Sequence, residues 1–182
     1  MAESDSGPTS PLDILGNIPA RFLEAKHRLN RVVLWAAIVG ILAGLVGTCF
    51  RMAVHHILQQ RQQLAAALAD YRILNWLIPS LVAGGMVYAS FWLVRRVAPD
   101  TAGSGIPQIE GALDNLLPFD WRRVLPVKFF GGMLSIGAGM IAGFEGPTIQ
   151  IGGAIGKMVA AFVGASSEQA RILIASGAGA GL

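Results

Sequence analysis

Residues 129–156 read FFGGMLSIGAGMIAGFEGPTIQIGGAIG, an apolar stretch that carries a single charged residue, Glu145. The glutamate separates 16 uncharged residues from 11, and neither piece reaches the roughly 20 residues that a helix needs to cross a bilayer. Short apolar segments interrupted by glycine are typical of the broken helices of channels and transporters, whose irregular backbone lines a cavity or is buried in protein. The stretch therefore predicts an all-α, polytopic membrane protein with tilted and broken helices.

Two longer apolar runs precede this stretch. Residues 32–50 are uncharged over 19 positions and residues 73–94 over 22, so each is long enough to span a bilayer. The first run is expected to continue as a long, tilted helix to about His56. Basic residues gather before the first run and again from Arg95 to Lys128. The positive-inside rule then predicts a hairpin of two helices with both ends in the cytoplasm.

The composition of the whole chain supports a membrane location. Of 182 residues, 53% are apolar and only 14% are charged, well below the charged fraction of a soluble domain. The net charge of +3 is too thinly spread to indicate a nucleic-acid partner. Residues 1–30 lack the apolar core of a signal peptide. We expect them to form a cytoplasmic segment, disordered over Met1–Pro11 and then mildly amphipathic, as an interfacial helix would be, and residues 31–182 to form the membrane domain.

The first motif with chemical meaning is Gly103-Ser104-Gly105-Ile106-Pro107. Its glycines permit a tight turn, and Pro107 suits the first turn of a helix. Two interpretations stay open at this point. The serine could simply cap a short helix in a loop, or its hydroxyl and the free N–H groups of the helix start could face an anion.

The second motif is Gly143-Phe144-Glu145-Gly146-Pro147-Thr148. A carboxylate within the bilayer costs roughly 2.5 kcal/mol or more, so such residues usually serve a pathway or relay protons. Pro147 predicts a new helix whose positive N-terminal end would favour Glu145, or an anion in its place. The alternative is a simple loop that holds Glu145 in water at the membrane face.

The remaining patterns give no sign of an enzyme. No second carboxylate, nucleophile or metal-binding cluster accompanies Glu145 in the sequence, so we expect no enzymatic activity, no metal and no cofactor. Residues 137–142 imitate a nucleotide-binding G-x-G-x-x-A, but no soluble strand precedes them. Four pairs of glycines have the G-x-x-x-G spacing that predicts close helix packing in lipid. These pairs are Gly40 and Gly44, Gly139 and Gly143, Gly152 and Gly156, and Gly177 and Gly181.

Together, the motifs at residues 103–107 and 143–147 resemble the two N-terminal signature motifs of the CLC chloride channels and chloride/proton antiporters. Residues 125–132, LPVKFFGG, and 147–153, PTIQIGG, look like the bacterial antiporter branch of that family. The resemblance runs from about Arg31 to Leu182. It implies the N-terminal part of the CLC inverted-repeat fold in a bacterial inner membrane.

The resemblance also implies roles for single residues. Ser104 would offer its hydroxyl to a central chloride, and Glu145 would be the gating glutamate, which occupies an anion site when ionised, swings out when protonated and passes the proton on. The implied anion-binding set is Ser104, Gly105, Ile106, Phe144, Glu145 and Gly146. The implied partners are chloride, protons, the lipid bilayer and a second copy in a homodimer, although the dimer surface of the family lies mostly in later helices.

The sequence departs from the family pattern in two ways. Phe144 stands where the family commonly has arginine, so the outer anion site would lack a fixed positive charge. The chain ends at Leu182, inside an apolar run and before the family's inner glutamate, second glycine-rich anion loop and chloride-coordinating tyrosine. We therefore expect chloride/proton antiport by the complete pathway, with a passive chloride channel or a truncated, non-transporting fragment as the alternatives.

Overall fold

The computed structural model describes residues 18–114 and 116–182, with side chains from residue 30 onward. All regular elements in these ranges are helices, which confirms the predicted all-α class. They are α2 (Ile18–Ala67), α3 (Leu74–Val97), the 3₁₀ turn η1 (Pro99–Thr101), α4 (Ile106–Leu113), α5 (Trp121–Gly137), α6 (Glu145–Phe162) and α7 (Ser167–Ala180). The disorder expected for Met1–Pro11 and the start of the amphipathic segment lie outside the described residues, and α2 crosses residue 31 without a break.

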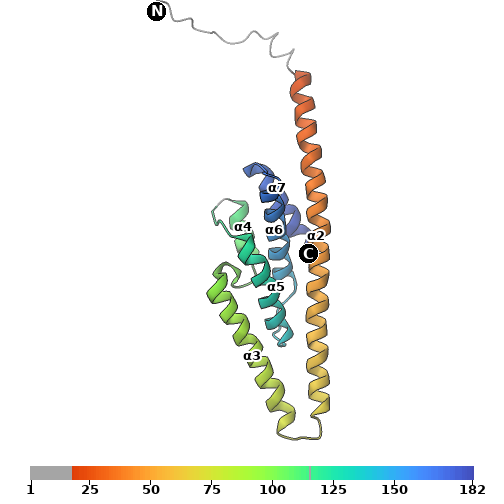
Figure 1. The fold of residues 1–182 in the computed structure, drawn as a ribbon, viewed down its shortest axis with the longest axis vertical. Helices are drawn as coiled ribbons and strands as arrows, with labels where there is room; N and C mark the ends of the chain where they lie inside the picture. The colour runs from red at the N-terminus through yellow and green to blue at the C-terminus, as the bar shows by residue number, and fades with distance from the viewer. Residues whose placement is uncertain (1–17, 115) are drawn as a thin grey trace, which may run out of the picture.

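The two long apolar runs form a helical hairpin, as the sequence predicted. In Figure 1, α2 extends along one side of the molecule, the chain turns at its lower end, and α3 runs back at a tilt. Within the described residues, Asn30–Ala67 and Leu74–Val97 are each long and apolar enough to cross a membrane. The first helix extends beyond the end expected near His56, because residues 57–67 are good helix formers without glycine or proline.

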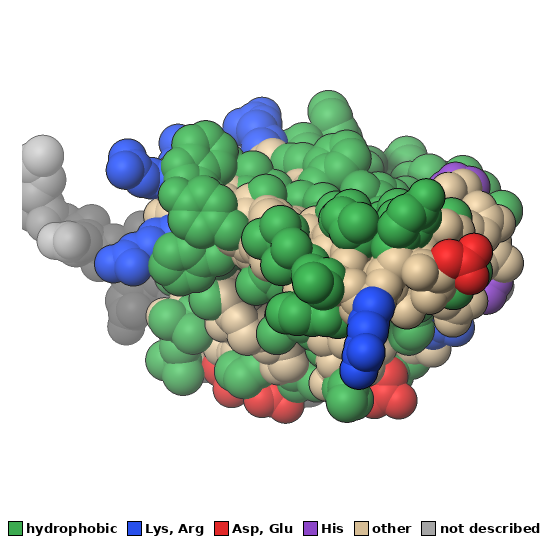
Figure 2. Space-filling model, turned by 90° about the horizontal axis from the view of Figure 1, so that it is seen from below, with side chains coloured by type: hydrophobic (Ala, Val, Ile, Leu, Met, Phe, Trp, Pro, Cys, Tyr) green, Lys and Arg blue, Asp and Glu red, His purple; other side chains and the backbone are tan. Residues whose placement is uncertain are grey.

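The outer surface of this hairpin is strongly apolar. Large hydrophobic side chains on α2 and α3 lie with more than half of their area exposed, among them Ile41, Leu45, Trp76, Leu81 and Tyr88. Figure 2 views the molecule from below, along its longest axis, and shows hydrophobic side chains over much of this end, with charged side chains mainly toward its edge. A protein in water rarely exposes so much contiguous apolar area, whereas lipid accepts it at no cost.

Helices α5, α6 and α7 pack beside the middle of α2 (Figure 1) and enclose the core. The largest fully buried side chains come from three of these helices: Phe50 of α2, Ile151 and Ile155 of α6, and Leu173 of α7. Helix α6 supplies much of the buried backbone because its glycines and alanines leave room for its neighbours. The core therefore fixes the start of α6, which carries Glu145.

In the sequence, Lys157 interrupts the apolar residues that follow Glu145, and this pattern predicts two short helical segments. That prediction is wrong, because α6 is continuous from Glu145 to Phe162. The long lysine side chain carries its ammonium group away from the helix, where it donates a hydrogen bond to the Phe119 carbonyl and lies 4.2 Å from the centre of the Phe119 ring. A cation that reaches such partners through a flexible stem does not have to end a helix.

The G-x-x-x-G pairs differ in what they do. Those of α6 and α7 hold the two helices in backbone contact: a methyl group on Gly152 would collide with the Gly177 carbonyl, and one on Gly156 with the Leu173 carbonyl. Gly139, by contrast, lies in a turn after α5 with φ of 95°, so its pair with Gly143 is not a helix contact. A methyl group on Gly40 would have no described atom within 4 Å, and the same holds for Gly44.

This difference gives a testable prediction for stability. Gly156→Ala places a methyl group against the backbone of α7, which cannot yield as a side chain can, so we expect a loss of roughly 1–3 kcal/mol in the free energy of unfolding. Thermal unfolding in detergent, followed by circular dichroism, measures this loss. Gly40→Ala is the matched control and should leave the melting temperature unchanged or slightly raised. Equal melting temperatures for the two variants would contradict the described contact of α6 with α7.

Candidate anion site

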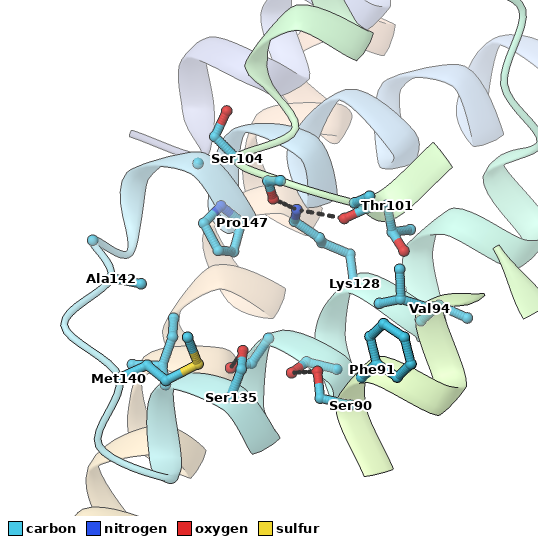
Figure 3. Close-up of a pocket in the computed structure, with 18 of the residues that line it drawn as sticks. Ser90, Phe91, Val94, Thr101, Ser104, Lys128, Ser135, Met140, Ala142 and Pro147 are labelled. Atoms are coloured by element: carbon cyan, nitrogen blue, oxygen red, sulfur yellow. Dashed lines mark hydrogen bonds between the residues drawn. The ribbon is translucent and has the colours of Figure 1, made fainter. Parts of the chain in front are cut away.

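A cavity of about 730 Å³ lies where the end of α3, the loop before α4, the middle of α5 and the start of α6 meet. Figure 3 shows Ser104 and Pro147 on one side of this cavity, with Lys128 and Thr101 beside them. Four of the six residues implied as anion-binding line it, namely Ser104, Ile106, Glu145 and Gly146. The structure therefore brings together two motifs that lie 40 residues apart in the chain.

The two remaining residues of that set lie elsewhere. Gly105 is buried, and a side chain there would collide with Gln150 of α6. The Phe144 ring packs edge-on against Phe50 of α2, with 6.4 Å between ring centres and 80° between ring planes. The Phe144 ring therefore serves packing, and at both positions only the backbone N–H group is left for contact with an anion.

Two helices begin at the cavity, and Ser104 in the loop before the first of them contacts the first turn of the second. Helix α4 begins at Ile106 after Gly105, whose φ of 94° favours glycine, and the Ile106 N–H donates to the Ser104 hydroxyl at 3.4 Å. Helix α6 begins at Glu145. A methyl group on Gly146 would lie 2.6 Å from the Ser104 carbonyl oxygen, so only glycine allows this approach. Free N–H groups at both starts give this side of the cavity a partial positive charge.

Lys128 of α5 anchors the loop before α4. Its side chain is 5% exposed, and its ammonium group donates to the carbonyl oxygens of Thr101 at 3.0 Å and Gly103 at 2.8 Å, as the dashed lines of Figure 3 show. Lys128 was expected to be one of the basic residues that set the membrane orientation, and this expectation is wrong because its ammonium group is buried in the wall of the cavity. A lysine among the apolar residues that follow Arg123 in α5 was the signal that could have revealed it.

Two glutamine side chains also donate hydrogen bonds to carbonyl groups of the loop before α4. Gln150 of α6 donates to the Asp100 carbonyl at 2.9 Å, and Gln108 of α4 donates to the Ala102 carbonyl at 3.1 Å. Together with Lys128, they give each of the four successive carbonyl groups of residues 100–103 a side-chain donor. Carbonyl oxygens would repel an anion, but each of these four accepts a hydrogen bond from a side chain. The same hydrogen bonds hold the loop in place before the start of α4.

Glu145 differs from these anchored residues. Its side chain is exposed, and among the described residues its carboxylate accepts no hydrogen bond and forms no ion pair within 4.0 Å. The hydroxyl of Thr148, in contrast, donates to the Phe144 carbonyl at 2.8 Å and fixes the first turn of α6. The backbone at Glu145 is therefore held while its carboxylate stays free to change position.

The cavity contains one ionisable group of each sign. Of the residues that line it, only Lys128 and Glu145 ionise; the other polar groups are hydroxyls and backbone amides. Two helix starts and one buried cation contribute positive charge to this cavity, and one carboxylate contributes negative charge. Fold and site thus define a polytopic helical membrane protein with a polar cavity at two helix starts.

Comparison with known proteins gives the family. The voltage gated chloride channel family matches residues 85–182, and the chain belongs to it. The H(+)/Cl(-) exchange transporter ClcA of Vibrio vulnificus is 47% identical over 163 residues, which are 89% of this chain and 35% of the relative. ClcA of Klebsiella pneumoniae is 45% identical over 168 residues, 92% of this chain and 36% of the relative.

A solved structure agrees with these relatives. A slow cyanobacterial Cl⁻/H⁺ antiporter superposes with a TM-score of 0.81 at 57% sequence identity, covering 83% of this chain and 36% of that one. The expected CLC fold, represented by its N-terminal part with membrane helices, is thereby confirmed. The chain spans about a third of the length of the relatives that it matches.

Proposed function

We propose that this chain supplies the N-terminal part of the pathway of a chloride/proton antiporter in the bacterial inner membrane. The observation that carries the proposal is the contact between the Ser104 loop and the start of α6 at one cavity, backed by the buried ammonium group of Lys128. The names of the relatives, which are H(+)/Cl(-) exchange transporters, support the same function.

Chloride binds on the positive side of this cavity. The Ser104 hydroxyl and the N–H groups of Gly105 and Ile106 provide a central position, and the N–H groups at Phe144 and Gly146 provide an outer one. Helix starts offer partial rather than full positive charge, so an ion binds firmly enough to shed water and weakly enough to leave. Every one of these groups comes from a single chain, so a homodimer would carry one pathway in each subunit.

Glu145 couples the proton to the anion. Its carboxylate and an outer chloride are both negative and are stabilised by the same N-terminal end of α6, so only one of them occupies that position at a time. Protonation removes the attraction of the carboxylate for the helix start and releases the side chain toward solvent. The exposed, unpaired state of the Glu145 side chain supports this role, because a carboxylate tied to a cation would move less readily.

Reconstitution into liposomes tests the proposal. Vesicles loaded with potassium chloride and made permeable to potassium should release chloride and take up protons when the 182-residue chain is present together with the C-terminal two thirds of the Vibrio vulnificus relative. Chloride release without proton movement would favour the passive channel instead. If neither the chain alone nor this pair released chloride, while the intact relative did, the alternative of a non-transporting fragment would replace the proposal.

A further inference from the structure

A second cavity, of about 710 Å³, lies on the other side of Glu145, between α2 and the chain that leads into α6. Arg51, Met52 and His55 of α2 line it, and residues 143–145 form the facing wall. Arg51 and His55 are four residues apart and so share one face of the helix. Glu145 and Gly143 line both cavities, which makes this space the continuation of the anion site toward α2.

The position of Arg51 along α2 places its charge close to the hydrocarbon core of the membrane. Twenty residues separate it from Arg31, which corresponds to about 30 Å along a helix and to the thickness of the hydrocarbon core. Arg51 thus lies near the membrane face opposite the N-terminal end of the spanning part of α2. An arginine at such a position normally faces water or a partner, and here it faces the second cavity.

The guanidinium group of Arg51 is only partly engaged. One of its nitrogens donates to the backbone oxygen of Leu182, the last residue of the sequence, at 3.2 Å, and among the described residues it forms no ion pair with an acidic side chain. Arginine has five N–H donors, so most of them stay available to solvent or to an anion in the cavity. The other ionisable groups that line this space are the Glu145 carboxylate on the facing wall and the His55 ring on α2 itself, which shares a hydrogen bond with Gln59.

The side chain next to Glu145 cannot provide this charge, because position 144 is a phenylalanine packed against Phe50. We propose that Arg51 is the cation of the outer mouth, drawing chloride through the second cavity toward Glu145 in place of the arginine that the family commonly has at position 144. This inference rests on the proposed chloride pathway. Arg51 acts there by its charge, since a fixed cation at a mouth with apolar walls raises the local concentration of anions.

The local potential is measured with a thiol probe. Gly143 is exposed and lines both cavities, and a methyl group added there would have no described atom within 4 Å, so Gly143→Cys is tolerated. In a Cys49→Ser background, the introduced thiol is reacted with an anionic and with a cationic methanethiosulfonate, and the ratio of the two rates reports the potential. Arg51→Gln should lower the anionic-to-cationic ratio on the order of fivefold at low salt, and less at high salt.

Two further variants sharpen the test. Arg72→Gln removes a cation from the loop between α2 and α3, lines neither cavity, and should leave the ratio unchanged. Phe144→Arg added to Arg51→Gln should restore the ratio, and by itself should tighten outer anion binding. An unchanged ratio in Arg51→Gln, or equal losses in Arg51→Gln and Arg72→Gln, overturns the assignment of Arg51. Because this readout needs no transport, a failed liposome experiment would count against the proposed function and not against the potential at Arg51.

Discussion

Replacing Glu145 by glutamine is expected to abolish proton movement while chloride movement persists. Glutamine keeps the size of the side chain but neither ionises nor carries a proton, so it cannot exchange places with chloride in response to pH. Chloride flux should become independent of pH, and the coupled proton uptake should fall to the level of protein-free vesicles. Simultaneous recording of chloride release and of external pH, with the protein in liposomes, measures both quantities.

The matched control for this prediction is Glu110→Gln. Glu110 is an exposed glutamate of α4 that lines neither cavity, so its loss should leave chloride flux, proton flux and their ratio as they were. Persistent, pH-dependent proton uptake in the Glu145→Gln protein would mean that another group carries the proton. In that case the proposed role of Glu145 would have to be given up.

Replacing Lys128 by methionine should remove the anion site. The change leaves the carbonyl oxygens of Thr101 and Gly103 without their donor, and unsatisfied buried groups of this kind cost about 1–3 kcal/mol each. It also deletes the cation behind the cavity. Since 1.4 kcal/mol corresponds to a factor of ten, we expect chloride flux to fall by at least about tenfold. Lys128→Arg, which keeps the charge, should lose less.

Lys157→Met is the control that separates this effect from general damage. Lys157 is a half-buried lysine that, like Lys128, donates to a backbone carbonyl, that of Phe119, but it lies toward the C-terminal end of α6 and outside the cavity. The variant should lose some thermal stability and keep its chloride flux per folded protein. Equal flux in the Lys128→Met and Lys157→Met proteins would show that the anchoring of the Ser104 loop is unimportant for transport.

The hairpin and the helix starts could be predicted from the sequence because they depend on local properties. Nineteen and 22 uncharged residues in a row identify α2 and α3, and a proline after a glycine pair or a glutamate marks the first turns of α4 and α6. The proximity of Ser104 to Glu145 could not be predicted from local properties. The residues alone allowed a capped loop and a solvent-facing glutamate, and only the family resemblance joined the two motifs.

Features that depend on long-range contacts could not be predicted. Lys128 and Lys157 look alike as single charges in apolar surroundings, yet one is buried behind the cavity and the other reaches the Phe119 carbonyl. The carbonyl groups that accept from Lys128 depend on how α5 packs against residues 100–103. Gly156 and Gly40 likewise both belong to pairs with the G-x-x-x-G spacing. Only Gly156 has a close neighbour, because α7 packs against α6 there.

The shared anion position can be observed directly with bromide, which replaces chloride and scatters X-rays anomalously near its absorption edge. Crystals of the protein with the remainder of the pathway, grown in bromide, should contain an anomalous peak within hydrogen-bonding distance of the Ser104 hydroxyl, and Glu145→Gln should add a second peak at the start of α6. Ordered crystals whose bromide peaks all lie away from residues 103–106 and 144–146 would contradict the account.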